Sequence, residues 1–181
     1  MLSAIVIMPS HPVRGSARSG PEALARAPEA LVRTLAALVP AAVEGVLRDL
    51  TIAAALGIAG LERVADHAGC ELVRESEPRG ALIKALSGTR ETNVFLIVAG
   101  RAPETGFTEE LAEFLRDGHR QAIMRVRPDT FITRLLPGFS PAAALLAPRE
   151  KLTAIAAGEL SYMSRRLGAA QTLRCRARRV D

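Results

Sequence analysis

The stretch Asn93-Val94-Phe95-Leu96-Ile97-Val98, followed by Ala99-Gly100-Arg101, decides the fold of this chain. A continuous apolar run of strand length that ends near a glycine is typical of a β-strand buried on both faces. Such strands belong to parallel sheets that helices cover on both sides, because a sheet with one wet face shows alternation instead. The run therefore predicts a parallel sheet at the centre of an α/β domain.

Strand-like and helix-like segments alternate around this run. We expect strands at 4–8, 50–54, 71–73, 94–98, 121–126, 145–148 and 172–178. We expect helices at 28–39, 61–68, 79–86, 108–116, 149–157 and 161–167, with a kink or a second short helix after Pro40. This order predicts a three-layer α/β/α domain with a mainly parallel sheet, as one domain over residues 1–181. Ligands of such sheets bind at the carboxyl ends of the strands.

The composition narrows the range of partners. The chain has a net charge of +5, and most of the positive charge is arginine, since lysine occurs only at Lys84 and Lys151. The arginine excess indicates either an anion-binding site or an ordinary basic surface. Only 3% of the residues are aromatic, so we expect no base-stacking platform and no nucleic-acid partner. Peripheral contact with an anionic membrane surface stays open as a third use of the charge.

The cysteines and the N-terminus predict the compartment. Cys70 and Cys175 stand far apart with no CxxC pair, so we expect two small buried thiols and neither a disulfide nor a metal site. The apolar segment from Met1 to Met8 is short, lacks a basic start and runs into Pro9, which favours a first strand over a signal peptide. We therefore expect a cytoplasmic protein.

Several motifs follow one another in a recognisable order. They are Pro9-Ser10-His11-Pro12, Thr34-Leu35-Ala36-Ala37-Leu38-Val39-Pro40, Val64-Ala65-Asp66-His67-Ala68-Gly69, Arg79-Gly80 and Glu159-Leu160-Ser161-Tyr162-Met163-Ser164-Arg165-Arg166-Leu167. With them the chain resembles bacterial family-two glycosyltransferases of the GT-A fold, over most of its length and more loosely after Phe107. The resemblance implies a nucleotide-diphospho-sugar transferase fold, a nucleotide-diphosphate sugar as ligand, and Mg²⁺ or Mn²⁺ as cofactor.

The chain departs from that family at its acidic positions. The resemblance places the nucleotide-binding acid at Ala54, the metal-binding acid at Gly100 and the catalytic base at Leu160. Alanine, glycine and leucine cannot bind a hard divalent cation or accept a proton. We therefore expect no metal cofactor, and a protein that is catalytically impaired or inactive.

A few residues remain as candidates for a site. Glu159 lies next to the lost base and either substitutes for it or is a solvated carboxylate at a helix start. Pro9 and His11 follow the first strand, where a nucleotide would bind, although a loop histidine is often merely exposed. Arg79 and Gly80 open a helix and suit a phosphate, or are ordinary surface positions. Arg101 stands beside the former metal position and either holds a diphosphate or is a solvent-facing loop arginine.

Three functional hypotheses follow. The first is a glycosyltransferase-like pseudoenzyme with a regulatory or structural role. The second is a metal-independent transferase with Arg101 or Arg79 on the diphosphate and Glu159 as base. The third is an anion-binding module. The aliphatic segment 28–46 indicates either a surface for a protein partner or homo-oligomer, or simply a part of the core.

Overall fold

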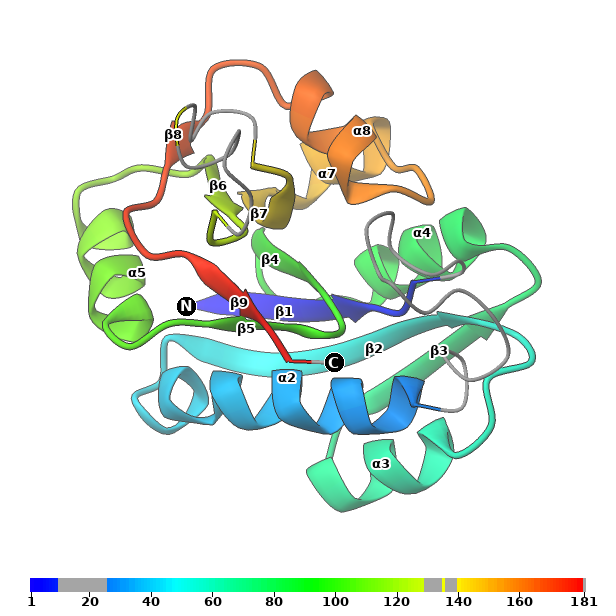
Figure 1. Ribbon diagram of the computed structural model, residues 1–181. Coiled ribbons are helices and arrows are strands. Elements are labelled where there is room, and N and C mark those ends of the chain that lie inside the picture. Colours follow the sequence, from blue (N-terminus) through cyan, green and yellow to red (C-terminus); the bar gives the residue numbers. More distant parts are fainter. Residues whose placement is uncertain (10–25, 129–134, 136–139, 181) are drawn as a thin grey trace.

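The structure, a computed structural model, describes residues 1–9, 26–128, 135 and 140–180 (Figure 1). In chain order the elements are β1 (Leu2–Ile7), α2 (Ala27–Val43), β2 (Leu47–Ala55), α3 (Leu61–Ala68), β3 (Glu71–Glu75), α4 (Pro78–Gly88), β4 (Asn93–Val98), β5 (Arg101–Pro103), α5 (Phe107–Arg116), β6 (Ala122–Arg125), β7 (Ala142–Pro148), α7 (Arg149–Ala154), α8 (Leu160–Arg166), β8 (Gln171–Thr172) and β9 (Ala177–Arg179).

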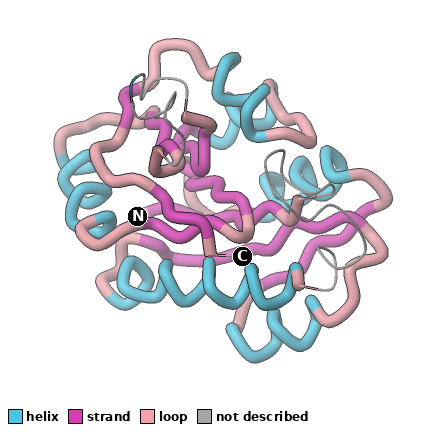
Figure 2. The backbone as a smooth tube through the Cα atoms, viewed as in Figure 1, coloured by secondary structure: helices cyan, strands magenta, loops and turns pink. Residues whose placement is uncertain are grey.

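A seven-stranded sheet in the order β3-β2-β1-β4-β7-β6-β8 forms the middle layer (Figure 2). Strands β3, β2, β1 and β4 run parallel, and β7 is antiparallel to both of its neighbours. Helices α2, α3 and α5 cover one face, and α4, α7 and α8 cover the other (Figure 1). The expected three-layer α/β/α fold with a mainly parallel sheet is confirmed.

The central strands are apolar throughout because both faces are buried. Along β1, Ala4 and Val6 pack with the α2 side of the core, and Ile5 and Ile7 with the α4 side. The run that begins at Asn93 forms β4, next to β1, and its inner residues are fully buried. Alternating side chains of one strand thus hold both helical layers in place.

Helix α2 differs from the sequence expectation. It continues through Pro40 to Val43 as one helix, without a second short helix. A proline inside a helix leaves the carbonyl four residues earlier without its donor, which here is that of Ala36. Ala36 is exposed, so water can satisfy this carbonyl. The end of the helix is closed by the Glu44 N–H, which donates to the Pro40 oxygen at 2.9 Å.

The C-terminal segment also departs from the expectation of one edge strand. Its first part, β8, pairs with β6 at the edge of the large sheet. Its second part, β9, pairs antiparallel with β5 in a separate two-stranded sheet that lies alongside α2 (Figure 1). Strand β5 was not predicted, because three residues are too few to show a period.

Among the described residues, no helix has both the length and the apolar character needed to cross a bilayer.

Candidate functional site

The sequence-predicted site lies at the carboxyl edge of the parallel strands. The ladder continues to this edge, because the Met8 N–H donates to the Ala53 oxygen at 2.8 Å and the Ala99 N–H to the Ile7 oxygen at 3.0 Å. The strand ends are therefore nearly level, and the loops that follow them come together. Pro9, directly after β1, is half-buried at this edge. His11 lies outside the described residues.

The turn after β4 holds Gly100, where the resemblance to family-two glycosyltransferases places the metal-binding acid. Gly100 has a φ of 84°, the left-handed region that favours glycine. Its N–H donates to Thr34 Oγ1 at 2.9 Å, and its oxygen accepts from the Val180 N–H at 3.1 Å. A Cβ added here would lie 3.7 Å from the Cβ of Ala30. The turn is packed between α2 and the end of the chain, and both of its backbone polar groups have partners.

These surroundings do not fit a divalent cation. Gly100 has no side-chain ligand, its carbonyl oxygen already accepts from the Val180 N–H, and Thr34 Oγ1 itself donates to the Ala30 oxygen at 3.0 Å. Over the described part of the chain, no group of three or more His, Cys, Asp or Glu side chains could hold a metal ion.

Arg101, next to this turn, is 7% exposed and lies in β5 opposite Arg179 of β9. The alternative that Arg101 is a solvent-facing loop arginine is wrong, because Arg101 is buried and belongs to a β-strand. Its assignment to a diphosphate stays a prediction.

The end of β2 contains Ala54, where the resemblance places the nucleotide-binding acid. The Ala54 methyl group is 1% exposed and packs in the core on the α2 and α3 side. The loop that follows is held by Arg74 on β3, whose Nη2 donates to the Ile58 oxygen at 2.9 Å. Arg74 also forms an ion pair with Glu62 of α3. Arg74 was not predicted as part of the site, although its place opposite Ala54 follows from the strand register.

Arg79, Gly80 and Glu159 form the open part of the edge. Arg79 is exposed in the first turn of α4, and Glu159 is exposed at the N-cap of α8. The structure brings these two helix starts together, since a Cβ added at Gly158 would lie 3.7 Å from the Cβ of Pro78. Among the residues described, neither Arg79 nor Glu159 has an ion-pair or hydrogen-bond partner for its side chain.

Leu160, where the resemblance places the catalytic base, lies one residue beyond Glu159 and is only 6% exposed. It packs into the core on the α4 side, so its side chain has a structural role.

A further acid, Glu75, ends β3 at the same edge. Its Oε1 lies 2.6 Å from Lys84 Nζ on α4. Gly80 packs against Glu75, since an added Cβ would come within 3.5 Å of the Glu75 Cβ. Glu75 was not predicted as part of the site, although an acid at the end of a parallel strand is itself a signal of a site.

The cysteines carry no reactive thiolate. Burial raises the pKa of Cys70 above its usual value. Burial raises the pKa of Cys175 most. The hydrogen bond with Glu110 and the negative charge of Glu110 raise it further, to about 11. Both thiols are therefore protonated near neutral pH and are poor nucleophiles. They are half-buried rather than fully buried as expected, and both are free.

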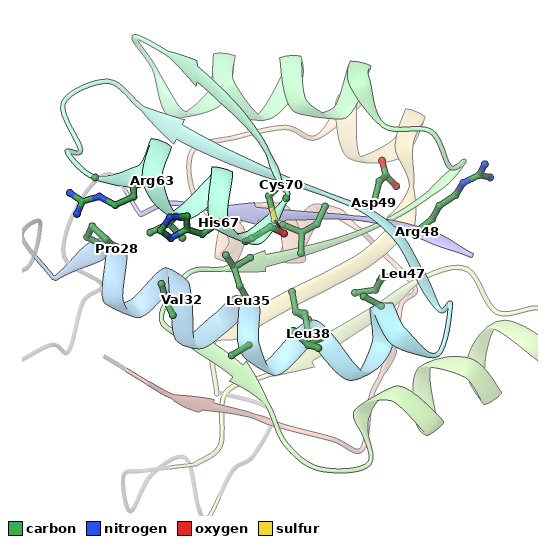
Figure 3. A pocket seen from close by; sticks show the side chains of 18 residues that line it. Pro28, Val32, Leu35, Leu38, Leu47, Arg48, Asp49, Arg63, His67 and Cys70 are labelled. Carbon is green, nitrogen blue, oxygen red and sulfur yellow. Dashed lines mark hydrogen bonds between the residues drawn. The ribbon is translucent and has the colours of Figure 1, made fainter.

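A cavity of about 950 Å³ lies away from this edge, between α2 and α3 (Figure 3). Most of its lining is aliphatic and comes from α2, α3 and the start of β2. The carboxylate of Asp49 at its end points away from α2 (Figure 3). This groove contains none of the predicted site residues.

The sheet order, the layers and the position of this edge define a GT-A-like nucleotide-sugar transferase fold. No protein-family model and no curated protein matches the chain. It is similar to glucosyl-3-phosphoglycerate synthase from Mycobacterium tuberculosis, solved with Mn²⁺, UDP and glucosyl-3-phosphoglycerate, at 17% identity over 94% of this chain and 69% of that one (TM-score 0.62). It is also similar to HddC from Yersinia pseudotuberculosis, solved with GMP-PN, at 11% identity over 99% of this chain and 94% of that one (TM-score 0.65). At these identities the likeness establishes the fold.

Proposed function

We propose that this chain is a glycosyltransferase-like protein that has lost metal-dependent sugar transfer and serves a regulatory or structural role. The observation that carries the proposal is the packed turn at Gly100. Where a metal-dependent transferase needs carboxylates for the cation on its diphosphate, Thr34 and Val180 occupy the polar groups of the backbone. The buried Leu160 at the position of the base supports the same conclusion.

A second candidate function is a metal-independent transferase, and the open part of the edge favours it. Arg79 presents a guanidinium in the first turn of α4, where the helix dipole also attracts anions. Glu159 stands at the neighbouring helix start and would act as the general base. In this candidate the ligand is still a nucleotide-diphosphate sugar. Protein cations neutralise its diphosphate in place of Mg²⁺ or Mn²⁺.

The third candidate, an anion-binding module at a membrane surface or another polyanion, rests on the net charge of +5. Binding of this kind falls steeply as the salt concentration rises. Unchanged binding to anionic vesicles between low and high salt would argue against it.

A transfer assay separates the first two candidates. We would incubate the chain with UDP-sugars and GDP-sugars, with Mn²⁺ or with EDTA, and measure release of the nucleoside diphosphate. The proposal predicts no release above that of a chain-free control in either condition. Release that persists in EDTA and is lost in both Arg79→Gln and Glu159→Gln would establish the second candidate, and release that requires Mn²⁺ would overturn the first.

A further inference from the structure

Helix α2 has an apolar face that the fold leaves uncovered. Val32, Ala36, Val39 and Val43 recur at helical spacing, so they lie in one stripe along the helix. The three valines are 49%, 54% and 80% exposed, respectively. The adjacent side of the same helix, about 100° around its axis, carries Leu31 and Leu38 and is buried in the core. The apolar surface of α2 is therefore wider than the part that the fold covers.

The stripe lies beside the groove of about 950 Å³ between α2 and α3. Val32, Ala36 and Val39 belong both to the stripe and to the groove lining. In Figure 3 the imidazole of His67 lies beside Val32, toward the α3 wall of the groove. Helix α2 thus carries the protruding apolar stripe and also forms one wall of the adjacent groove. A surface with both shapes can pair with a copy of itself.

The charges on α2 indicate how such a pair would be oriented. Arg33 and Glu44 are about three helical turns apart, so both flank the stripe on the same side. Glu44 is the C-cap residue, and no basic residue lies in the last turn. An acid at the negative end of a helix is unfavourable when no cation is nearby. Within the described residues, the Glu44 side chain has no hydrogen-bond or ion-pair partner.

We propose that two copies of this chain associate through α2, with the two helices antiparallel about a two-fold axis between Ala36 and Val39. In this arrangement Val32 of each copy meets Val43 of the other. The small side chain of Ala36 lets the helices approach closely. Arg33 of each copy flanks Glu44 of the other, so the charge pair forms twice.

Charge complementarity is the reason to assign a second copy to this face. An antiparallel pair supplies the missing cation at the C-terminal end of each α2. Arg33 can provide it while its Nη1 donates to the Val180 oxygen at 3.2 Å, because a guanidinium has five N–H groups. The contact is one helix of about 25 Å against another. Since stable interfaces bury about 1,200–2,000 Å² in total, we expect a dimer at the weak end, with a Kd of about 1–100 μM.

Sedimentation equilibrium of the full chain, from about 1 to 200 μM, tests this directly. We expect a reversible monomer–dimer equilibrium. Val39→Asp should raise the dissociation constant at least about tenfold, because it places a charge in the centre of the contact. The matched control is Tyr162→Asp, a substitution at another exposed apolar residue, on the opposite helical layer. It should leave association unchanged. Thermal unfolding of each variant verifies that it is folded.

A charge exchange tests the orientation. Glu44→Arg should weaken association about threefold to tenfold by placing like charges together, and adding Arg33→Glu should restore it. A double variant no better than Glu44→Arg would overturn the antiparallel arrangement. A wild-type chain that stays monomeric over the whole range, or a Val39→Asp variant that associates normally, would overturn the proposal and leave the groove to a helix of another protein. The inference does not rest on the proposed function.

Discussion

Two parts of the carboxyl edge of the sheet contrast sharply. At the Gly100 turn the chain fills the site with itself, through Thr34 on one side and Val180 on the other. At the starts of α4 and α8, Arg79 and Glu159 are exposed and have no partner among the described residues. We therefore expect the Gly100 turn to stabilise the fold and the side chains of Arg79 and Glu159 to contribute little to stability.

The two parts differ in what a charged side chain costs when no ligand is bound. Acidic residues in a metal site repel one another when the metal is absent, so replacing them with packed small residues stabilises the chain. Exposed charges at helix starts carry no comparable penalty and can persist without a ligand. The difference predicts unequal effects of substitution at the two parts.

Gly100→Asp, which introduces the acid that the resemblance places here, should have the largest effect. A non-glycine residue at this φ, together with a carboxylate buried against Ala30, should lower the free energy of unfolding by about 3 kcal/mol. Urea denaturation measures it. Gly118→Asp is the matched control, because Gly118 has a similar φ of 80° with nothing within 4 Å of an added Cβ. We expect about 1 kcal/mol there. Equal losses at both positions would mean that the Gly100 turn is not closed by packing.

Thr34→Val should have the next largest effect. It keeps the shape of the side chain but leaves the buried Gly100 N–H without an acceptor, at a cost of about 2 kcal/mol. Thr153→Val is the control. Its hydroxyl also donates to the carbonyl four residues earlier, at 2.9 Å, but on the surface, so we expect less than about 0.5 kcal/mol. Chemical denaturation of the two variants measures both losses. A larger loss in Thr34→Val than in Thr153→Val would show that Thr34 stabilises the Gly100 turn and not only its own helix.

Arg79→Gln and Glu159→Gln should change the free energy of unfolding by less than about 0.5 kcal/mol each, because both side chains are exposed. A loss of more than about 1 kcal/mol in either variant would show that this part of the edge is structural as well. Thermal unfolding at low and high salt checks that no hidden ion pair is lost.

Ionisation of Cys175 should leave the free energy of unfolding unchanged near neutral pH and lower it only in alkali. Its thiol has a pKa of about 11 in the folded chain against 9.0 as the ordinary value. The folded pKa is raised, so the stabilising contribution is complete below about pH 9 and is lost as the pH rises toward 11. Iodoacetamide should alkylate folded Cys175 about 100-fold more slowly at pH 8 than the unfolded chain. Equal rates would contradict the shift.

The parallel half of the fold could be predicted from the sequence, because its strands are long apolar runs. β1 and β4 were placed within two residues of their observed bounds for this reason. β5 and β9 could not be recognised as a pair, because three-residue strands carry no periodicity and their pairing joins distant segments. The continuous path of α2 through Pro40 was missed because exposure of the Ala36 carbonyl is a tertiary property.

For the candidate site, the sequence predicted which residues lie at one edge of the sheet, and that this edge binds a ligand stays a prediction. Strand order placed Pro9, Arg79 and Gly100 at one edge, since parallel strands end together. That Gly100 is covered by Val180 depends on a residue far along the chain, which no local pattern reveals. The burial of Arg101 has the same origin.

The most direct test of the central claim, that the metal-dependent site is closed, is the thermal stability of the chain with UDP or GDP, with and without Mn²⁺. A ligand at about a hundred times its Kd raises the free energy of unfolding by about 2.7 kcal/mol, which shifts the midpoint of a domain of this size by several degrees. The account predicts that Mn²⁺ makes no difference to the midpoint with either nucleotide. A nucleotide-induced shift that appears only with Mn²⁺ would contradict it.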